Sequence, residues 1–400
     1  MIQRETYLRQ LQLLKDVQLI KVVTGLRRSG KSTLLEQFRQ ELLNVGIPGK
    51  CTQTYNLENP DYSGFDDWKK FYDHIKRKLV SNTMNYVFLD EIQMIDNFER
   101  LLDGLHLLKN TDVYVTGSNA YLLSGELATI LTGRSIAINM YPFSFAEYVE
   151  YLGITNANEI NLADYIQTGG LPQALELKKI DFNSYVNYLN GLLTTIIEKD
   201  IKTRNKIYND KSFNDVTRFL ADSIGSSVSS NSIAKAFKNL KVEIDDKTIT
   251  RYISVLNDSF VFYPVQRFDI KGKNILKTNG KQYIADTGFR NVLLGRTQLQ
   301  DTGHLLENIV YFELLRRGNT VWIGKSNKNE IDFVVKNKQG YIQYYQVTVS
   351  MRDENTRNRE LAALNSIKDH NPKTIISLDP EEPVYDGIVC RNAIKWLLEK

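Results

Sequence analysis

Residues 25–32 read Gly-Leu-Arg-Arg-Ser-Gly-Lys-Ser, and this stretch decides the fold of the N-terminal part of the chain. A short apolar run, residues 19–24, precedes it, and a helical run, residues 33–38, follows it. Gly25 and Gly30 permit the backbone turns that aim amide N–H groups at phosphate oxygens, and the start of the following helix adds a partial positive charge. The pattern therefore predicts a strand, a phosphate-binding loop and a helix, in that order.

The same loop carries side chains suited to a nucleoside triphosphate. The Lys31 ammonium is expected to contact the β and γ phosphates, and the Ser32 hydroxyl is expected to bind magnesium. ATP and Mg²⁺ are therefore the predicted ligands. The remaining residues expected to line the nucleotide site are Gly25, Arg28, Ser29, Gly30 and Thr33. Arg27 and Arg28 could add phosphate contacts or point outward.

An acidic pair follows a second apolar strand, residues 86–89. Asp90 is predicted to hold magnesium, and Glu91 is predicted to polarise the attacking water. The alternative is that the two acids cap the helix that follows. Together with the glycine loop, the pair favours hydrolysis of ATP over binding alone.

Two further residues are candidates for catalysis. Asn119 follows the strand at residues 113–116 and could orient water or sense the γ phosphate, although Asn is also an ordinary turn residue. Arg134 could stabilise transferred charge, in its own subunit or in a neighbouring one, or could be a solvated arginine.

Composition sets the broad class of the protein. Its 400 residues, 42% hydrophobic and 24% charged, fit a globular chain of two or three domains. The net charge of +4 does not identify a polyanionic partner. Cys51 and Cys390 lack the spacing of a zinc site, and the four histidines are scattered singly. With no signal-like N-terminus and no long apolar segment, we expect a cytoplasmic protein with no membrane partner.

The pattern of apolar runs suggests four domains. Residues 1–155 alternate strands with helices, as in an α/β domain with a mainly parallel sheet. Residues 156–211 look like a helical lid. Residues 212–290 give three helices and a hairpin, the order of a winged helix, and residues 291–400 give a helix followed by strands, as in a small α/β domain.

These motifs resemble prokaryotic AAA+ ATPases that have an N-terminal AAA-type domain and a C-terminal DUF4143 domain. Besides the loop and the acidic pair, the resemblance rests on six more segments, residues 116–119, 133–134, 141–147, 169–172, 284–288 and 330–333. It implies a P-loop AAA+ domain with a helical lid, then a winged helix, then a restriction-endonuclease-like fold. It also makes an oligomer, such as a ring or a dimer, an expectation.

Basic side chains in the winged-helix segment make double-stranded DNA a candidate partner. The expected recognition helix carries Lys247 and Arg251. The hairpin could meet phosphates through four lysines: Lys271, Lys273, Lys277 and Lys281. The alternative is a solvated hairpin whose neighbouring helices bind a protein client.

The resemblance implies a nuclease-like site in residues 291–400, where Glu307 and Asp332 fit the helix glutamate and the strand aspartate of that fold. On the next strand, Gln346 and Thr348 stand where that fold has a carboxylate and a lysine. Because hard cations prefer charged oxygen ligands, we predict that this domain is an inactive nuclease retained for binding. Glu330 is a candidate replacement ligand.

The sequence thus predicts an ATPase whose nucleotide state is coupled to modules that bind DNA. Two alternatives stay open. One is a nucleotide-dependent protein-interaction switch with negligible turnover, and the other is an ATP-gated nuclease.

Overall fold

The structure, a computed structural model, describes residues 2–65, 67–118, 133–202, 205, 207, 209–296, 298, 300–326 and 329–399, without the side chains of Ser63 and residues 277–279. Contacts along the chain divide it into two units. Unit 1 comprises Met1–Met140 and Asp258–Phe260, and unit 2 comprises Tyr141–Asn257 and Val261–Lys400.

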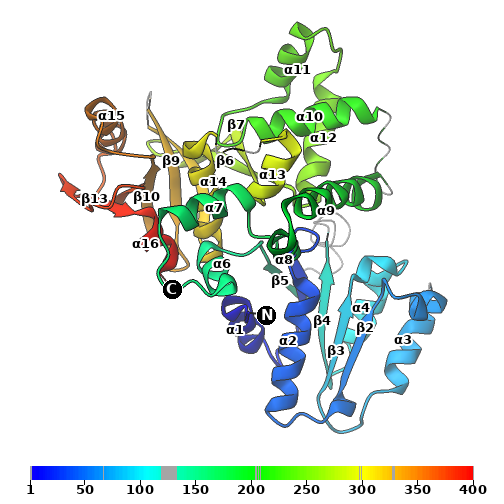
Figure 1. Cartoon of the computed structure of the whole chain (residues 1–400). Helices are drawn as coiled ribbons and strands as arrows, with labels where there is room; N and C mark the ends of the chain where they lie inside the picture. Colours follow the sequence, from blue (N-terminus) through cyan, green and yellow to red (C-terminus); the bar gives the residue numbers. More distant parts are fainter. Residues whose placement is uncertain are drawn as a thin grey trace. The chain divides into compact units, whose positions relative to one another are not determined.

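Unit 1 is built on a five-stranded sheet with the order β2-β3-β4-β1-β5 (Figure 1). Its strands are β1 (Ile20–Thr24), β2 (Thr52–Asn56), β3 (Asn85–Asp90), β4 (Thr111–Gly117) and β5 (Ser135–Asn139). Every neighbouring pair is parallel, so the carboxyl ends of all five strands lie along one edge. The α/β fold with a parallel sheet is therefore confirmed.

Helices cover both faces of this sheet, because successive strand residues point to opposite sides. Val23, Phe88 and Tyr114 pack with α1 and α2, whereas Val22 and Val87 pack with α3 and α4. These helices are α1 (Glu5–Leu13), α2 (Lys31–Asn44), α3 (Trp68–Arg77) and α4 (Phe98–His106), and short 3₁₀ helices lie at Gly49–Cys51, Pro60–Phe65 and Ile92–Met94.

Unit 2 contains an eight-stranded mixed sheet with the order β12-β13-β11-β10-β9-β8-β6-β7. Its strands are β6 (Phe262–Asp269), β7 (Asn274–Ile284), β8 (Thr320–Ser326), β9 (Asn329–Lys336), β10 (Ile342–Val347), β11 (Lys373–Ser377), β12 (Val384–Tyr385) and β13 (Ile388–Asn392). The helix α14 (Thr302–Arg316) packs on β7, β8, β9 and β10, and its residues from Leu305 to Leu314 are all buried. α14 is thus buried on all its sides, although its buried residues include the polar Glu307, Asn308 and Glu313.

The other helices of unit 2 pack on this sheet or on one another. They are α6 (Phe145–Leu152), α7 (Glu159–Thr168), α8 (Pro172–Ile180), α9 (Phe182–Thr195), a π-helical segment (Ile196–Lys202), α10 (Asp210–Asp222), α11 (Ser230–Asn239), α12 (Asp246–Asp258), α13 (Thr287–Leu294), α15 (Glu354–Asn365) and α16 (Ala393–Leu398). None of the helices among the described residues has the length and apolarity needed to cross a membrane.

The predicted order of three helices and a hairpin is present as α10, α11, α12 and the β6–β7 pair. The hairpin does not stand apart, because β6 also pairs with β8 in the sheet that continues through β13. The sheet therefore runs across the boundary expected at residue 290. The winged helix and the four-domain division stay predictions.

Candidate functional site

The glycine loop leaves the carboxyl end of β1 and enters α2, as the sequence predicted. Gly25 has a φ of +141°, and a Cβ atom at this position would lie 2.0 Å from the backbone oxygen of Met140. Gly30, directly before α2, has a φ of +103°. Both positions therefore need glycine, the first for close approach and both for backbone conformation.

Lys31 is folded onto the loop that it follows. Its side chain is buried, and its Nζ donates hydrogen bonds to the backbone oxygens of Gly25, at 3.1 Å, and Leu26, at 3.2 Å. The Ser29 hydroxyl is buried and has no hydrogen-bond partner among the described residues. Ser32 and Thr33 are exposed at the start of the helix. The loop thus presents a cation and hydroxyl donors together, which suits phosphate oxygens.

The two predicted metal ligands, Ser32 and Asp90, come together at this edge. Asp90 ends β3, and its Oδ1 accepts a hydrogen bond of 2.6 Å from the Thr116 hydroxyl of β4. Burial raises the pKa of the Asp90 carboxyl, while hydrogen bonds from Thr116 and Ser32 act in the opposite direction. The carboxylate is therefore buried, oriented and adjacent to the loop, as a ligand for a divalent cation should be.

Glu91 is held by polar groups that the sequence did not reveal as functional. Its backbone adopts a left-handed conformation, with a φ of 56°, and its N–H donates to the Thr116 hydroxyl at 2.9 Å. Its Oε2 accepts hydrogen bonds from the Ser118 hydroxyl, at 3.2 Å, and from the Gln93 side-chain amide. The sequence showed these residues beside the two motifs, but only the fold shows that they converge on one carboxylate.

The two loop arginines differ in their surroundings. Arg27 is buried, and its Nη2 lies 2.5 Å from the Glu58 carboxylate. Arg28 is exposed and has a φ of 66°. Arg28 is thus the loop arginine whose side chain remains at the surface.

The structure does not bring Arg134 to the loop. Its backbone oxygen accepts a hydrogen bond from Ile20 at the start of β1, whereas the loop leaves the far end of that strand. Five strand residues separate the two ends by about 16 Å. The Arg134 guanidinium forms an ion pair with Asp103 of α4. Asn119, the other catalytic candidate, lies outside the described residues.

The basic candidates for DNA binding divide into exposed and buried positions. Lys247 and Arg251 of α12 are exposed, as are Lys271 and Lys273 between β6 and β7. The side chain of Lys277 lies outside the described residues. Lys281 corrects the expectation of a solvated hairpin lysine, because it is only 4% exposed.

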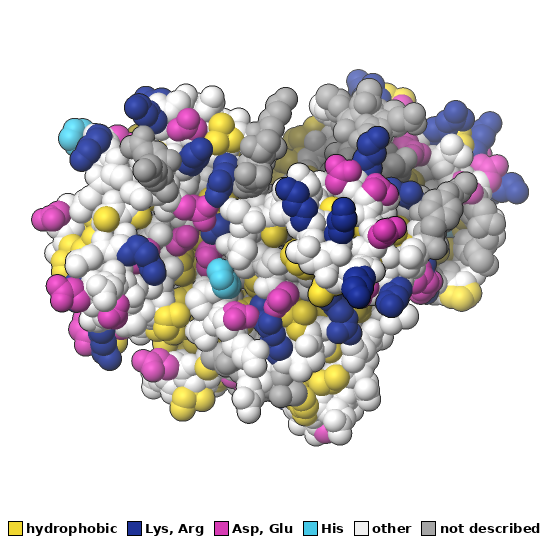
Figure 2. Space-filling model, turned by 90° about the horizontal axis from the view of Figure 1, so that it is seen from above, with side chains coloured by type: hydrophobic (Ala, Val, Ile, Leu, Met, Phe, Trp, Pro, Cys, Tyr) yellow, Lys and Arg dark blue, Asp and Glu magenta, His cyan; other side chains and the backbone are white. Residues whose placement is uncertain are grey.

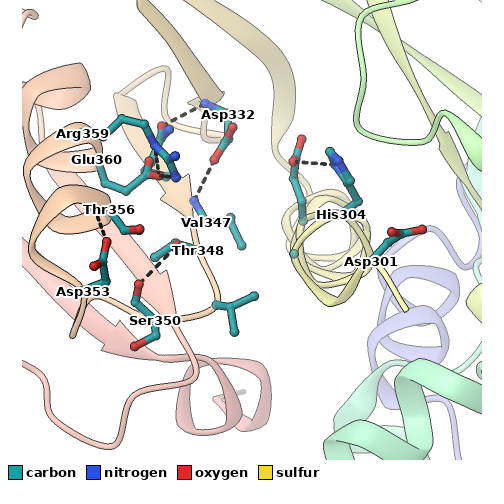
Figure 3. A pocket seen from close by; sticks show the side chains of 14 residues that line it. Asp301, His304, Asp332, Val347, Thr348, Ser350, Asp353, Thr356, Arg359 and Glu360 are labelled. Carbon is teal, nitrogen blue, oxygen red and sulfur yellow. Dashed lines mark hydrogen bonds and ion pairs between the residues drawn. The ribbon is translucent and has the colours of Figure 1, made fainter. Parts of the chain in front are cut away.

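The four residues of the nuclease-like pattern line one pocket of about 530 Å³ in unit 2. Glu307 comes from α14, Asp332 from β9, Gln346 from β10 and Thr348 from the residue after β10. Figure 3 shows His304 of α14 on one side of this pocket and Asp332 and Thr348 on the other. The predicted elements therefore deliver these side chains to a common space.

Comparison with known proteins gives two family matches along the chain. Residues 17–149 match the family described as AAA domain. Residues 159–300 match a domain of unknown function, DUF8612. The AAA-type N-terminal domain is thus confirmed, whereas the matched downstream domain is DUF8612 and not the DUF4143 domain expected from the motifs.

Two relatives match over most of their length. An uncharacterized protein of Haemophilus influenzae is 37% identical over 100% of this chain and 99% of its own. An uncharacterized protein of Methanocaldococcus jannaschii is 28% identical over 88% of this chain and 79% of its own. The crystal structure of Cdc6p from Pyrobaculum aerophilum aligns with 77% of this chain and 94% of its own, at 12% identity and a TM-score of 0.31, which supports no conclusion about function.

Proposed function

The chain belongs to the same family of AAA-domain proteins as the Haemophilus influenzae relative, and on this basis we propose that it binds ATP with magnesium and hydrolyses it. The observation that carries the proposal is the convergence of Ser32, Asp90 and Glu91 on the edge of the sheet from which the glycine loop emerges. A binding loop alone would need no second carboxylate beside the metal ligand.

The described residues fit the nucleotide and the ion. The loop N–H groups and Lys31 would hold the phosphates, and the buried Ser29 hydroxyl would gain the partner that it lacks among the described residues. Ser32 and Asp90 would hold magnesium. When bound, magnesium neutralises charge on the phosphates and on the leaving group.

We assign Glu91 the role of the water-activating group. Its Oε2 is occupied by Ser118 and Gln93, which fix the plane of the carboxylate. Its backbone is fixed by Thr116, which also holds Asp90. The carboxylate can therefore accept a proton from water at a set position relative to the metal ligand.

Steady-state phosphate release tests this proposal. Glu91→Gln should lower kcat by about a hundredfold or more while ATP still binds, because the amide cannot accept the proton. Lys31→Ala should abolish ATP binding itself. Glu99→Gln, a carboxylate change on α4, is the matched control and should retain the wild-type rate. If wild type and Glu91→Gln release phosphate equally slowly, hydrolysis is not the function, and a nucleotide-dependent switch with negligible turnover is the alternative.

We further propose that unit 2 binds double-stranded DNA through exposed cations of α12 and the hairpin. The support is local, because α12 buries Ile249, Tyr252 and Leu256 and leaves Lys247 and Arg251 outward. On the face in Figure 2, Lys and Arg side chains are interspersed with Asp and Glu, so no single basic field covers it. Because α12 carries few side chains able to read base edges, contacts to phosphates are a stronger expectation than readout of bases.

The salt dependence of DNA affinity tests this second proposal. Changing Lys247, Arg251, Lys271 and Lys273 together to alanine should weaken binding and flatten the slope of log K against log salt by about 0.9 per lost contact. A matched set of four exposed lysines of unit 2, Lys325, Lys336, Lys338 and Lys368, should have a smaller effect when changed to alanine. Equal losses in the two sets would move the DNA site elsewhere.

A further inference from the structure

Lys281 brings a positive charge into the carboxylate cluster beside the unit 2 pocket. It lies on β7, and its Nζ is 2.8 Å from Glu307 Oε1, 3.0 Å from Glu330 Oε1 and 3.9 Å from Asp332 Oδ1. The three acids come from α14 and β9, so the ammonium joins the hairpin to two other elements. From its sequence position, Lys281 was expected to be an exposed hairpin lysine. In the structure, its ammonium instead lies among the three carboxylates.

The charges in the cluster are nearly balanced without any ion. Arg267 pairs with Glu330, so two cations face three carboxylates. Burial alone would lower the pKa of Lys281, but the carboxylates of Glu307, Asp332 and Glu330 outweigh it and raise that pKa. Burial raises the pKa of Asp332 well above its usual value, and Glu307 adds to the effect.

Three of the oxygens that a metal would use already have hydrogen-bond partners. Glu307 Oε1 accepts hydrogen bonds from Lys281 and, at 2.5 Å, from the Tyr283 hydroxyl. Asp332 Oδ2 accepts one of 2.8 Å from the backbone N–H of Val347. Gln346 Oε1 accepts one of 3.1 Å from the backbone N–H of Asp332.

The restriction-endonuclease-like fold expected for this part of the chain implies a divalent metal at this place. The residues present do not fit one. Divalent cations in proteins need several oxygen ligands within about 2.0–2.6 Å, and an ammonium already fills the space between Glu307 and Asp332. Across the described part of the chain, no three His, Cys, Asp or Glu side chains are arranged to hold a metal.

We propose that Lys281 is a built-in cation that takes the place of a divalent metal among Glu307, Glu330 and Asp332, so that this site is metal-independent in the wild-type protein. The ammonium compensates the buried carboxylates and fixes β7 to α14. Removal of the ammonium leaves carboxylates without a counter-charge, which is the condition under which a divalent cation binds.

The proposal is tested by measuring the binding of Mn²⁺ to the full chain without nucleotide. Bound Mn²⁺ is detected as a loss of the electron paramagnetic resonance signal of the free ion. Lys281→Met should bind Mn²⁺ at least tenfold more tightly than wild type, and adding Asp332→Asn should abolish the gain. Lys281→Arg keeps the cation and should show no gain. Lys336→Met, at an exposed lysine of β9, should also bind Mn²⁺ as wild type does.

Loss of a buried counter-charge can prevent folding, so thermal unfolding is measured in parallel. Mn²⁺ should raise the Tm of Lys281→Met but leave that of wild type unchanged. A second variant, Lys281→Met with Glu330→Gln, removes one charge of each sign and should still gain Mn²⁺ binding. The proposal is overturned if neither variant binds Mn²⁺. It is also overturned if the wild-type protein binds Mn²⁺ as tightly as Lys281→Met does and Asp332→Asn in the wild-type protein abolishes that binding.

Discussion

At the scale of single residues, the Thr116 hydroxyl links the two acids of the candidate ATPase site. It donates to Asp90 Oδ1 at 2.6 Å and accepts from the backbone N–H of Glu91 at 2.9 Å. Because β4 lies beside β3, this hydroxyl reaches both neighbours from one position. β4, which carries neither acid, thereby fixes the distance between the proposed metal ligand and the proposed water-activating group.

Gln93 is the second residue that positions Glu91. Its side-chain amide donates to Glu91 Oε2, and its own Oε1 is buried without a partner among the described residues. Gln93→Ala should lower kcat about tenfold, because a positioned catalytic group loses its effect when its orientation is released. The Kd for ATP should stay the same, as measured with a fluorescent analogue. The matched control is Met94→Ala, an exposed neighbour; a fall in ATP affinity for Gln93→Ala would contradict a positioning role.

Gly25 tests the geometry of the loop itself. Alanine there would place Cβ 2.0 Å from the Met140 oxygen in a conformation that costs about 1–3 kcal/mol for a residue with a side chain. The loop must shift, so Gly25→Ala should weaken ATP binding at least tenfold by isothermal titration calorimetry. Gly64→Ala is the control, since nothing lies within 4 Å of its Cβ position. Similar ATP affinity in the two variants would show that the loop tolerates the shift.

At the scale of elements, one carboxylate fastens two helix starts in unit 2. Asp286 caps α13 by accepting from the Phe289 N–H at 2.9 Å, and its other oxygen accepts from the Gly170 N–H, just before α8, at 2.7 Å. The glycine pair is required here, because a Cβ on Gly169 would lie 2.2 Å from Asp286 and one on Gly170 would lie 2.4 Å from the Phe143 oxygen. Residues 169–172, Gly-Gly-Leu-Pro, and residues 285–288, Ala-Asp-Thr-Gly, are thus packed together and hydrogen-bonded through Asp286, and we call this contact the Asp286 joint.

This joint should give unit 2 a measurable pH dependence. Burial raises the pKa of Asp286 from 3.8 to about 6, so its contribution to stability is full below pH 3.8 and is lost as the pH rises through 6. Relative to Asp286→Asn, the wild-type free energy of unfolding should fall by about 2 kcal/mol between pH 4.5 and 7.5. Urea unfolding at a series of pH values measures this difference.

The control for this pH series is Asp181→Asn at the cap of α9. The Asp181 carboxylate is exposed, and its hydrogen bonds to Ser184 lower its pKa. The contribution of Asp181 to stability is therefore present above its ordinary pKa and is lost only in more acidic solution. The difference in unfolding free energy between wild type and Asp181→Asn should thus stay constant from pH 4.5 to 7.5. If the difference in unfolding free energy between wild type and Asp286→Asn also stays constant over this pH range, the Asp286 carboxylate titrates as an exposed one does.

Sequence patterns predicted the strands that carry the ATPase site but not the edges of the sheets. β1, β3 and β4 are buried at every position because both faces are covered, and each stands out in the sequence as a mostly apolar run. β2, with the sequence Thr-Gln-Thr-Tyr-Asn, is a half-buried edge strand and has no such signal. Lys281 was misjudged for a similar reason, since its burial depends on α14 and β9, which lie later in the chain.

At the scale of the whole molecule, the chain passes from unit 1 to unit 2 at Met140 and Tyr141. Met140 pairs with β1 through its N–H, which donates to the Thr24 oxygen at 2.7 Å, and its own oxygen faces Gly25. On the other side of the connection, the Pro142 oxygen accepts from Arg316 at 2.9 Å and the Phe143 N–H donates to the Gly170 oxygen at 2.8 Å. Each end of this short connection is held within its own unit.

Hydrogen exchange can test whether nucleotide state passes through this connection. Saturation with a non-hydrolysable ATP analogue should slow amide exchange in residues 25–32, because bound ligand stabilises the closed loop. If nucleotide state is coupled to unit 2 as the sequence predicts, amide exchange in residues 141–145 and 169–172 should also slow, and neither change should occur in Lys31→Ala. Protection confined to unit 1 would separate ATP binding from any effect on unit 2.

The place of β1 in its sheet also has a consequence for synthesis of the chain. β1 lies between β4 and β5, so the strand of this sheet that is synthesised first obtains both of its partners last. About 115 residues separate the end of β1 from the end of β5, which at roughly 5–20 residues per second is a wait of about 6–23 s. Until β4 is complete at residue 117, β1 has no neighbouring strand, and until residue 139 one of its two edges stays unpaired. Nascent chains that stall before residue 139 are therefore the ones we expect to need chaperone protection from aggregation.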